Sequence, residues 1–339
     1  MKFIYTLVAL FLGLALSAQM DILDSVIQKK KGKEYVAYTF KTSTVVTAHS
    51  VEMCKKHALD FRITHRFGDI AATNADNIHT LFGFDQAQDI GILFDYGVTD
   101  DLTVGTSRMK GAGDLTELWS LNIKYRILKQ TKDFKTPVTI TMFGNTVISS
   151  ELSSGDPSTI NYFPSNNYHG FSNRLTYLAQ SMIATKATDW LSIQLSPTFL
   201  WRNNVAYNDK NGMFALGLLW RAKFNQRMCL IFEYFTPIRK QGVDDWEFFP
   251  MLRGIKNSST TTNINYPDLE IGLEFETGGH VFHVNFSNTA GILENDFLAY
   301  NPHNWLQGQF RLGFDISRTF QLDKKGGKYW KKGSIEEAN

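Results

Sequence analysis

Short segments in which apolar and polar residues alternate one by one recur along the whole chain. In the last of them, residues 310–320, aromatic and aliphatic residues occupy one face while small or charged residues occupy the other. The apolar face consists of Phe310, Leu312, Phe314, Ile316 and Phe320, interrupted by Arg318. A period of two predicts an extended strand whose two faces meet different surroundings. Such a strand suits a wall between lipid and a polar interior.

Twelve segments of this kind are strand candidates, and no apolar run beyond the first 20 residues is long enough for a helix that spans a bilayer. The candidates are 58–67, 89–97, 102–110, 117–128, 137–148, 173–186, 190–202, 213–224, 228–237, 268–277, 280–288 and 305–320. Because lipid offers no partners to backbone groups, a membrane protein without such helices must be a closed barrel. We therefore expect an all-β fold, a closed antiparallel up-and-down transmembrane β-barrel of about twelve strands, within a range of roughly 10–14.

The connections between these segments alternate between short and long. Short turns are expected at 98–101, 131–134, 188–189, 225–226 and 278–279. The long connections are 68–88, 149–172, 203–212, 238–267 and 289–304. Outer-membrane barrels have this asymmetry, with short periplasmic turns and long external loops. A soluble exported β-sandwich would also contain alternating strands, but it would not confine the long connections to one end.

An even number of strands puts both chain termini on the side of the short turns. Residues 35–46 are also β-prone, but counting them as a strand would give thirteen and move the N-terminus to the long-loop side. We therefore expect them in a periplasmic or plug-like extension. The expected divisions are a signal peptide at 1–18, a periplasmic N-terminal extension at 19–57, the barrel at 58–321 and a periplasmic tail at 322–339.

The first residues predict export. Lys2 precedes an apolar run over residues 3–16 and a small-residue site, so we expect a signal peptide that is cleaved after Ala18. The formal net charge of +2 gives no reason to expect a nucleic acid partner. Cys54 and Cys229 form no CxxC motif and are expected to be structural or free, with a disulfide as the alternative.

Four short stretches carry a family resemblance. They are Phe61–Gly68 (FRITHRFG), Leu81–Asp85 (LFGFD), Asp95–Asp100 (DYGVTD) and Lys124–Gln130 (KYRILKQ). These stretches resemble a family of outer-membrane β-barrels that is found in Bacteroidota and is catalogued as a domain of unknown function. The resemblance covers most of the mature chain and implies an outer-membrane location and a barrel architecture. Since the family has no settled activity, the resemblance implies no catalytic residue.

Charged and polar residues on the inner faces of these strands are expected to line the interior of the barrel. The candidate lumen-lining residues are Asp60, Arg62, Arg66, Asp95, Lys124, Arg126, Arg202, Arg221, Lys223, Glu233, Glu270, Glu274, Glu276, His283, Arg311 and Asp315. Basic residues gather at 202–223 and acidic residues at 233–276, so opposite stripes could orient a polar solute in the bore. The alternative is that the charges pair with one another and fill a narrow bore.

The long connections are rich in aromatic residues for exposed segments. The candidate mouth-loop aromatics are Phe82, Phe84, Tyr162, Phe163, Tyr168, Phe171, Trp246, Phe248 and Phe249. Because apolar loop residues need burial, we expect these loops to fold over or into the mouth of the barrel. They would form either a compact cap or an aromatic ligand pocket.

The sequence gives no sign of an enzyme, a metal site or a cofactor. His65 faces outward near the external end of its strand, as a lipid hydrolase would need, but the neighbouring segments 87–88 and 305–306 supply no Ser nucleophile. His65 is better interpreted as part of an aromatic belt. His280 and His283 lie on opposite faces of one strand and cannot share an ion. No HExxH, Walker loop or GxGxxG motif is present.

These observations lead to one functional hypothesis and one alternative. The first is a passive small-solute channel or ligand-binding barrel with aromatic external loops. The alternative is a structural or assembly barrel with a filled lumen, which recruits an envelope protein; a lipid hydrolase is less favoured. The expected location is the outer membrane of a Gram-negative bacterium, with outer-membrane lipid as a partner and both termini in the periplasm.

Overall fold

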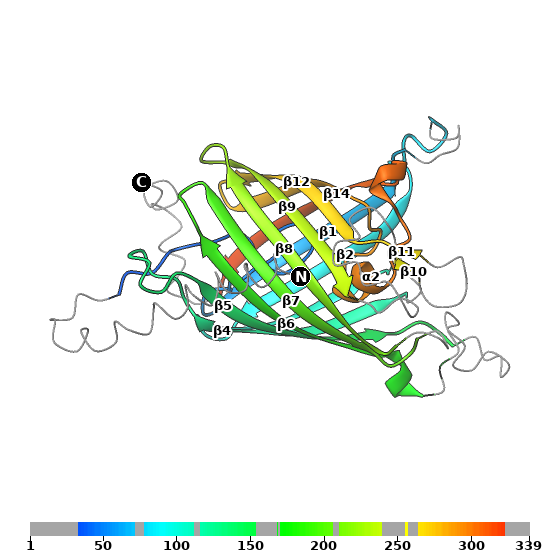
Figure 1. The fold of residues 1–339 in the computed structure, drawn as a ribbon, viewed down its shortest axis with the longest axis horizontal. Helices are drawn as coiled ribbons and strands as arrows, with labels where there is room; N and C mark the ends of the chain where they lie inside the picture. The colour runs from blue at the N-terminus through cyan, green and yellow to red at the C-terminus, as the bar shows by residue number, and fades with distance from the viewer. Residues whose placement is uncertain are drawn as a thin grey trace, which may run out of the picture.

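Figure 1 shows the computed structural model, in which twelve strands form one closed antiparallel β-barrel. The structure describes residues 33–71, 78–111, 116–153, 168, 170–205, 210–238, 255–256 and 264–322. Each barrel strand pairs with the barrel strands before and after it in sequence, and the first pairs with the last to close the wall. The expected fold class and strand number are therefore confirmed. The expected signal peptide and the tail from residue 323 lie outside the described residues.

The barrel strands are 8 to 12 residues long, as tilted strands that cross a bilayer need to be. They are β1 (Ala58–Asp69), β2 (Ala87–Gly97), β3 (Leu102–Met109), β4 (Leu118–Leu128), β5 (Thr139–Ser149), β6 (Leu175–Lys186), β7 (Leu191–Arg202), β8 (Gly212–Lys223), β9 (Met228–Ile238), β12 (Asp268–Thr277), β13 (His280–Ser287) and β14 (Arg311–Gln321). Two short strands, β10 (Ile255–Lys256) and β11 (Ile264–Asn265), pair outside the barrel. Within the described part of the chain, no helix has the length and apolar character to cross a membrane.

The strand limits agree with the expected ones to within two residues, except at the start of the last strand. The expected strand 305–320 was wrong at its beginning, because residues Trp305–Gln307 form the 3-10 helix η6. The Asn304 side chain caps this turn by accepting a hydrogen bond from the Leu306 amide, and Gly308 ends it in the left-handed region at φ 73°. The strand therefore begins only at Arg311.

The alternation in β14 separates an inner face from an outer one. Arg311, Asp315 and Ser317 are buried inside the barrel, whereas Phe314 and Ile316 are only partly covered. The seam with β1 is regular over most of its length, from Ala58 opposite Gln321 to Arg66 opposite Gly313. The apolar outer face is the surface that meets hydrocarbon in a membrane-bound barrel.

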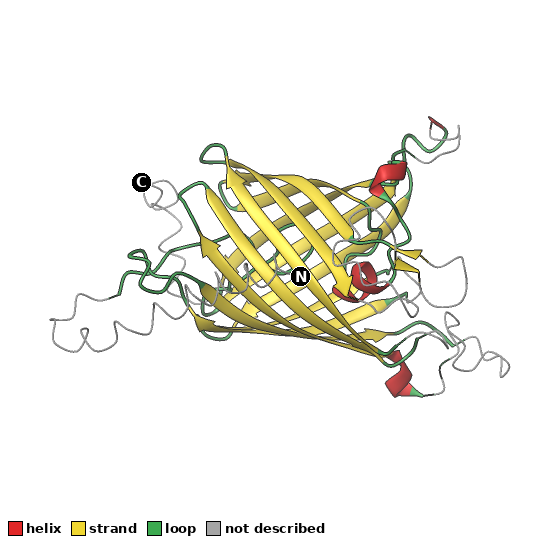
Figure 2. Ribbon diagram, in the orientation of Figure 1, coloured by secondary structure: helices red, strands yellow, loops and turns green. Residues whose placement is uncertain are grey.

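Short and long connections alternate around the barrel, as the sequence predicts. The short ones, which include 98–101 and 278–279, share one end with the start of β1 and the end of β14. The longest ones, 150–174 and 239–267, lie at the other end. The short helices lie toward this second end (Figure 2), and they include η5 (Phe171–Arg174) and α2 (Glu294–Ala299).

The interior of the barrel is occupied by two segments of the chain itself. Residues 39–51 enter from the short-turn end, and α2 enters from the long-loop end. All six residues of α2 are buried. Backbone hydrogen bonds join Val36 to Gln130 and His57 to Gly97, so both ends of the N-terminal segment are anchored at the short-turn end. Residues 35–46, for which a periplasmic and a plug-like position were open, thus run into the lumen.

Candidate functional site

Most of the candidate lumen-lining residues are buried in the interior of the barrel. The buried ones are Asp60, Arg62, Arg66, Asp95, Lys124, Arg202, Glu233, Glu270, Glu274, His283, Arg311 and Asp315. The other four are Arg126, Arg221, Lys223 and Glu276, which lie near the short-turn end and are partly exposed. Charged groups in such numbers are tolerated inside a barrel only when each one has a hydrogen-bonding or charged partner.

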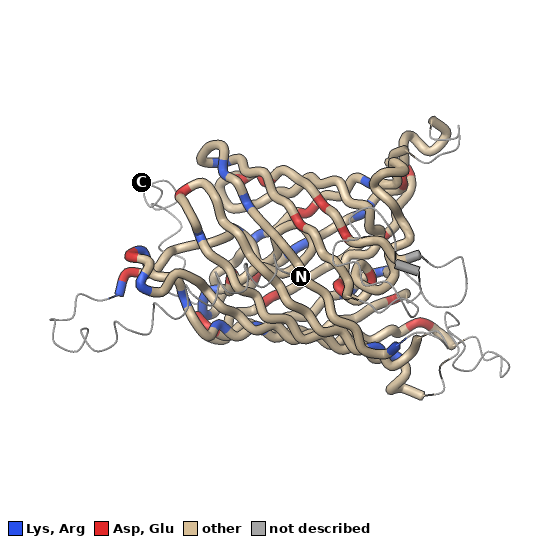
Figure 3. Tube along the Cα trace, viewed as in Figure 1, with Lys and Arg blue, Asp and Glu red and all other residues tan. Residues whose placement is uncertain are grey.

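Several opposite charges in the lumen pair directly. Arg66 on β1 contacts Glu270 on β12 with 2.6 Å between Nη2 and Oε1, and both side chains are almost completely buried. Arg221 contacts Glu274 at 2.7 Å, and the other carboxylate oxygen of Glu274 lies 3.4 Å from His283. Basic and acidic positions accordingly lie next to one another along the wall (Figure 3).

Residues 39–51, which we call the plug, form a compact hairpin inside the barrel. The Val45 amide donates to the Ala48 carbonyl, and the Ser50 amide donates to the Ser43 carbonyl, each at 2.9 Å. Most of the plug is buried by the surrounding wall. Burial raises the pKa of nearby Glu52, whose carboxylate accepts hydrogen bonds from the Thr39 and Phe40 amides. The plug therefore has its own internal structure.

The tip of the plug is held by one carboxylate of the wall. Glu233 on β9 accepts hydrogen bonds from three consecutive backbone amides, those of Val46, Thr47 and Ala48, at 3.3, 3.0 and 2.9 Å. The Thr47 hydroxyl donates to Glu270 at 2.7 Å. Because Glu233 accepts from three amides in a row, it is the principal latch on the tip.

Further wall residues, among them Lys124 and Gln194, hold the arms of the plug. Lys124 on β4 donates from Nζ to the carbonyls of Ser43 and Ser50, at 2.7 and 3.3 Å. Gln194 on β7 accepts from the Val51 amide at 2.9 Å and donates to the His49 carbonyl at 2.8 Å. Arms and tip are thus fixed from three sides of the barrel.

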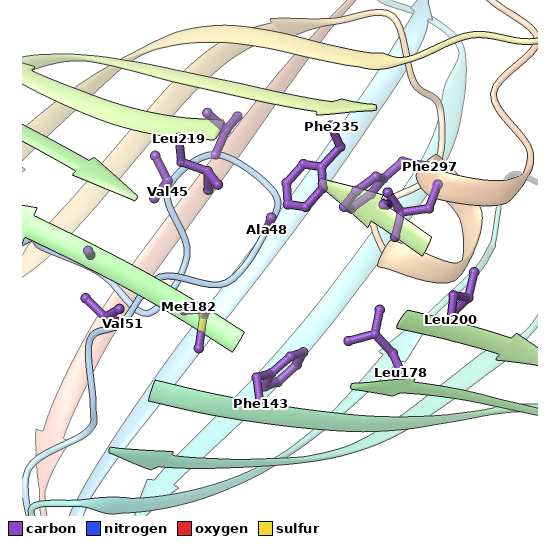
Figure 4. Close-up of a cluster of buried hydrophobic side chains, with 14 of the residues drawn as sticks. Val45, Ala48, Val51, Phe143, Leu178, Met182, Leu200, Leu219, Phe235 and Phe297 are labelled. Carbon is purple, nitrogen blue, oxygen red and sulfur yellow. The ribbon is translucent and has the colours of Figure 1, made fainter. Parts of the chain in front are cut away.

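One half of the lumen is apolar. The plug contributes Phe40, Val45, Val46, Ala48 and Val51 to a buried cluster, and α2 contributes Phe297, Leu298 and Ala299. The wall contributes inward-facing residues of β5 to β9, which include Phe143, Leu178, Met182, Leu200, Leu219 and Phe235. Figure 4 shows these side chains converging from the plug, from the strands and from the helix. At about 25 cal/mol per Å² of apolar surface, their burial favours the plugged state.

Helix α2 enters the lumen from the long-loop end and packs against the apolar side of the wall. The Phe297 ring packs against Phe235 on β9, with 5.4 Å between ring centroids. The Asn265 side chain donates to the Leu298 carbonyl at 2.9 Å and ties the helix to the chain before β12. The helix begins with Glu294, which is 2 % exposed, and burial raises the pKa of this carboxyl to about 7.

The buried Glu294 carboxyl predicts a dependence of stability on pH. In the folded state the carboxyl keeps its proton up to about pH 7, whereas in the unfolded chain it ionises near pH 4.5. Its contribution is thus fully present below pH 4.5 and is lost as the pH rises to 7, by on the order of 3 kcal/mol. Denaturant unfolding of wild type and Glu294→Gln across this range measures the difference. We expect the decline to be smaller in the variant by this amount; parallel pH profiles for the two proteins would contradict the prediction.

The four candidate mouth-loop aromatics that the structure describes do not gather in one place. Tyr168 is buried beside Ile292 and Leu293 in a second apolar cluster. Phe82 and Phe171 are 48 % and 66 % exposed. Phe84 is also exposed, and its ring lies 5.5 Å from the lipid-facing ring of Phe67. The remaining five lie outside the described residues, and they are Tyr162, Phe163, Trp246, Phe248 and Phe249.

The side chains with potential chemical reactivity, His65, Cys54 and Cys229, pack as structural residues. His65 lies between the rings of Phe67 and Phe314, with centroids 4.4 and 5.7 Å away, on the outer face of β1. Its neighbours across the strands are Ile90 and Phe314, and neither is a nucleophile. Both cysteines, Cys54 and Cys229, are buried and free. Within the described ranges, no group of three or more His, Cys, Asp and Glu side chains has the arrangement of a metal site.

Several interior residues were not among the predicted lumen-lining residues, and they include Asp268, the plug-binding Gln194 and a set of apolar side chains. Asp268 continues the inward face of β12, but it stands at the strand end and was not included. The apolar inward residues of β5 to β9, such as Leu219 and Phe235, were hidden by the assumption that the inner face is polar. Leu219 lies two residues before Arg221, and Phe235 lies two residues after Glu233. This spacing is a sequence signal that could have predicted their inward orientation.

Comparison with known families is consistent with this architecture. The sequence profile described as "Membrane bound beta barrel domain (DUF5777)" matches residues 40–320. The chain belongs to this family. The matched region of this DUF5777 barrel includes nearly the whole plug, together with all twelve strands of the wall.

Solved structures similar to this DUF5777 barrel include bacterial porins. The NanC porin aligns with a TM-score of 0.42 and 11 % identity over 78 % of this chain and 100 % of the porin. The KdgM porin gives 0.43 and 10 % over 78 % and 99 %, and an outer membrane channel from Pseudomonas putida F1 gives 0.46 and 11 % over 80 % and 98 %. These likenesses concern the barrel architecture alone. No curated protein matches the sequence.

Proposed function

We propose that this membrane-bound barrel is a gated channel for small polar solutes in the outer membrane, closed at rest by its own plug. The proposal places both termini in the periplasm. The observation that carries it is how the plug is held. Glu233, Lys124 and Gln194 bind plug backbone groups by hydrogen bonds that water or a polar solute can replace when the plug withdraws.

The wall around the plug tip supports a solute pathway. After withdrawal, the inner faces of β1, β4, β9 and β12 would present Arg66, Lys124, Glu233 and Glu270 to water. Rings of charged side chains are the usual lining of pores that pass polar solutes. The apolar contacts of the plug with β5 to β9 favour the closed state at rest. The proposal involves no catalysis, and His65 remains a residue of the lipid-facing belt.

A second candidate is a structural or assembly barrel that recruits an envelope protein. It is favoured by the apolar cluster, because a permanently filled barrel can have a continuous core in which the plug and α2 are fixed parts. The two candidates differ in one measurable property. The channel must open under some condition, whereas the structural barrel stays closed whenever it is folded.

Weakening the latch on the plug tip is expected to open the channel. Glu233→Ala removes the acceptor of three plug amides, so the open fraction should rise by about tenfold or more for a loss of roughly 1.4 kcal/mol or more. Single-channel recording in planar bilayers measures it. Glu233→Gln keeps one carboxamide oxygen as an acceptor and should open less often.

The control for this variant is Glu276→Ala. Glu276 forms a salt bridge with Lys41 at 2.6 Å, but both side chains are about one third exposed, so its loss should change opening little. If folded Glu233→Ala remains at the conductance of bare bilayers, the gated channel is wrong and the structural barrel is favoured.

A further inference from the structure

The lipid-facing surface of β3 forms a groove between two ridges. Val104 and Thr106 face outward from β3. On one side, β2 places Tyr96 opposite Val104 and Phe94 opposite Thr106; on the other, β4 places Leu121 opposite Thr106. Short side chains between longer ones leave a depression that follows the strand direction.

This groove deepens into an apolar hollow of about 460 Å³. The hollow is lined by Leu59, Phe94, Tyr96, Val104, Gly105, Thr106, Leu121 and Asn122. The backbone of Gly105 forms part of its floor, and a side chain at this position would collide with Asp95 and Asn122 on the lumen side. The volume falls within the 300–1,000 Å³ that small-molecule sites occupy. The hollow therefore has room for an elongated apolar group.

A positively charged side chain, that of Arg108, lies at one end of the hollow. Arg108 is the next outward-facing residue of β3 after Thr106, about 6.6 Å further along the strand. Its guanidinium lies 5.5 Å from the ring of Trp119 and donates to the Met109 and Leu118 carbonyls. An Arg on the lipid face is costly except near the headgroups, where anionic groups can pair with it. Arg108 therefore marks the headgroup end of the hollow.

We propose that this groove is a binding site for one anionic, phosphate-bearing lipid. Its acyl chain occupies the hollow along β3, and Arg108 pairs with its phosphate. The groove is continuous with the surface that faces hydrocarbon, so the occupant is delivered by the bilayer. The apolar lining selects an acyl chain, and the guanidinium selects a phosphate-bearing headgroup through paired N–H donors.

Native mass spectrometry of the full chain, released from micelles that contain equal amounts of phosphatidylglycerol and phosphatidylcholine, tests this site. Wild type should retain one phosphatidylglycerol in preference to phosphatidylcholine. Thr106→Phe fills the hollow and should reduce the retained lipid by about tenfold, which corresponds to roughly 1.4 kcal/mol. Arg108→Gln should keep the acyl chain but equalise the two headgroups.

The matched control is Ala179→Phe, which enlarges a small lipid-facing residue on β6, away from the groove. It should retain lipid like wild type. The inference is overturned if Thr106→Phe retains as much lipid as wild type, if Ala179→Phe loses as much, or if Arg108→Gln keeps the headgroup preference. Each protein is first checked for the heat-modifiable mobility of a folded barrel. Val104→Trp fills the same hollow and replaces Thr106→Phe if that variant does not fold.

Discussion

Replacing residues 39–51 with a flexible Gly-Ser segment of equal length is expected to convert a closed barrel into one that conducts. The substitution keeps the length of the backbone, but it removes the apolar contacts of the plug with β5 to β9 and the ordered hairpin that presents backbone groups to Glu233, Lys124 and Gln194. The vacated space lies between charged wall residues, so water can fill it. Recordings in planar bilayers should change from baseline to resolved single-channel steps.

Two comparisons make this result interpretable. A Gly-Ser insertion in the short turn at 278–279, outside the lumen, should leave the conductance of the barrel at the wild-type level. The plug variant must also migrate as a folded barrel before heating, because apolar residues such as Leu219 lose their cover in it. A folded plug variant that still does not conduct would contradict a channel that the plug closes, because α2 and the wall side chains would then close the bore without it.

Glu270→Ala is expected to cause the largest loss of stability among single substitutions of charged residues in the lumen. Arg66 is 2 % exposed and would lose the carboxylate that lies 2.6 Å from its guanidinium. Thr47 and Ser287 would each lose a hydrogen-bond acceptor as well. Breaking a buried ion pair by removing one partner costs roughly 3–5 kcal/mol, because the other charge stays buried without compensation.

The matched control removes both charges. Arg66→Met with Glu270→Leu replaces the pair by apolar side chains of similar size, and it should recover most of the lost stability. Urea unfolding of protein folded into lipid vesicles measures the free energy of unfolding of Glu270→Ala and of the double variant, each relative to wild type. If the double variant is as unstable as Glu270→Ala, the loss arises from the contacts of Thr47 and Ser287 and not from an isolated Arg66.

The wall of the barrel could be predicted from the sequence because its pattern is local. In β14, the choice between the inner and the outer face follows from neighbours two residues apart, as Asp315 and Phe314 illustrate. The start of this strand was wrong because Trp305 and Leu306 continue the apolar pattern, while the capping side chain of Asn304 and the left-handed Gly308 favour a 3-10 turn.

The contents of the barrel could not be predicted in the same way. Glu233 and Thr47 are separated by 186 residues, and their hydrogen bond exists only after the wall has closed. The sequence of residues 35–46 is β-prone and fits a strand or a hairpin equally well. Leu219 and Phe235 contradict a polar inner face. Their inward orientation is explained only by the plug and α2, which fill the space in front of them.

The plug both enters and leaves through the same mouth of the barrel. Val36 is bound to Gln130 before the hairpin, and His57 is bound to Gly97 after it. No part of the described polypeptide from residue 33 to residue 57 passes from one opening to the other. The segment can accordingly slip back by the way it came, with the seam between β1 and β14 intact and without any free end having to be drawn through the cylinder.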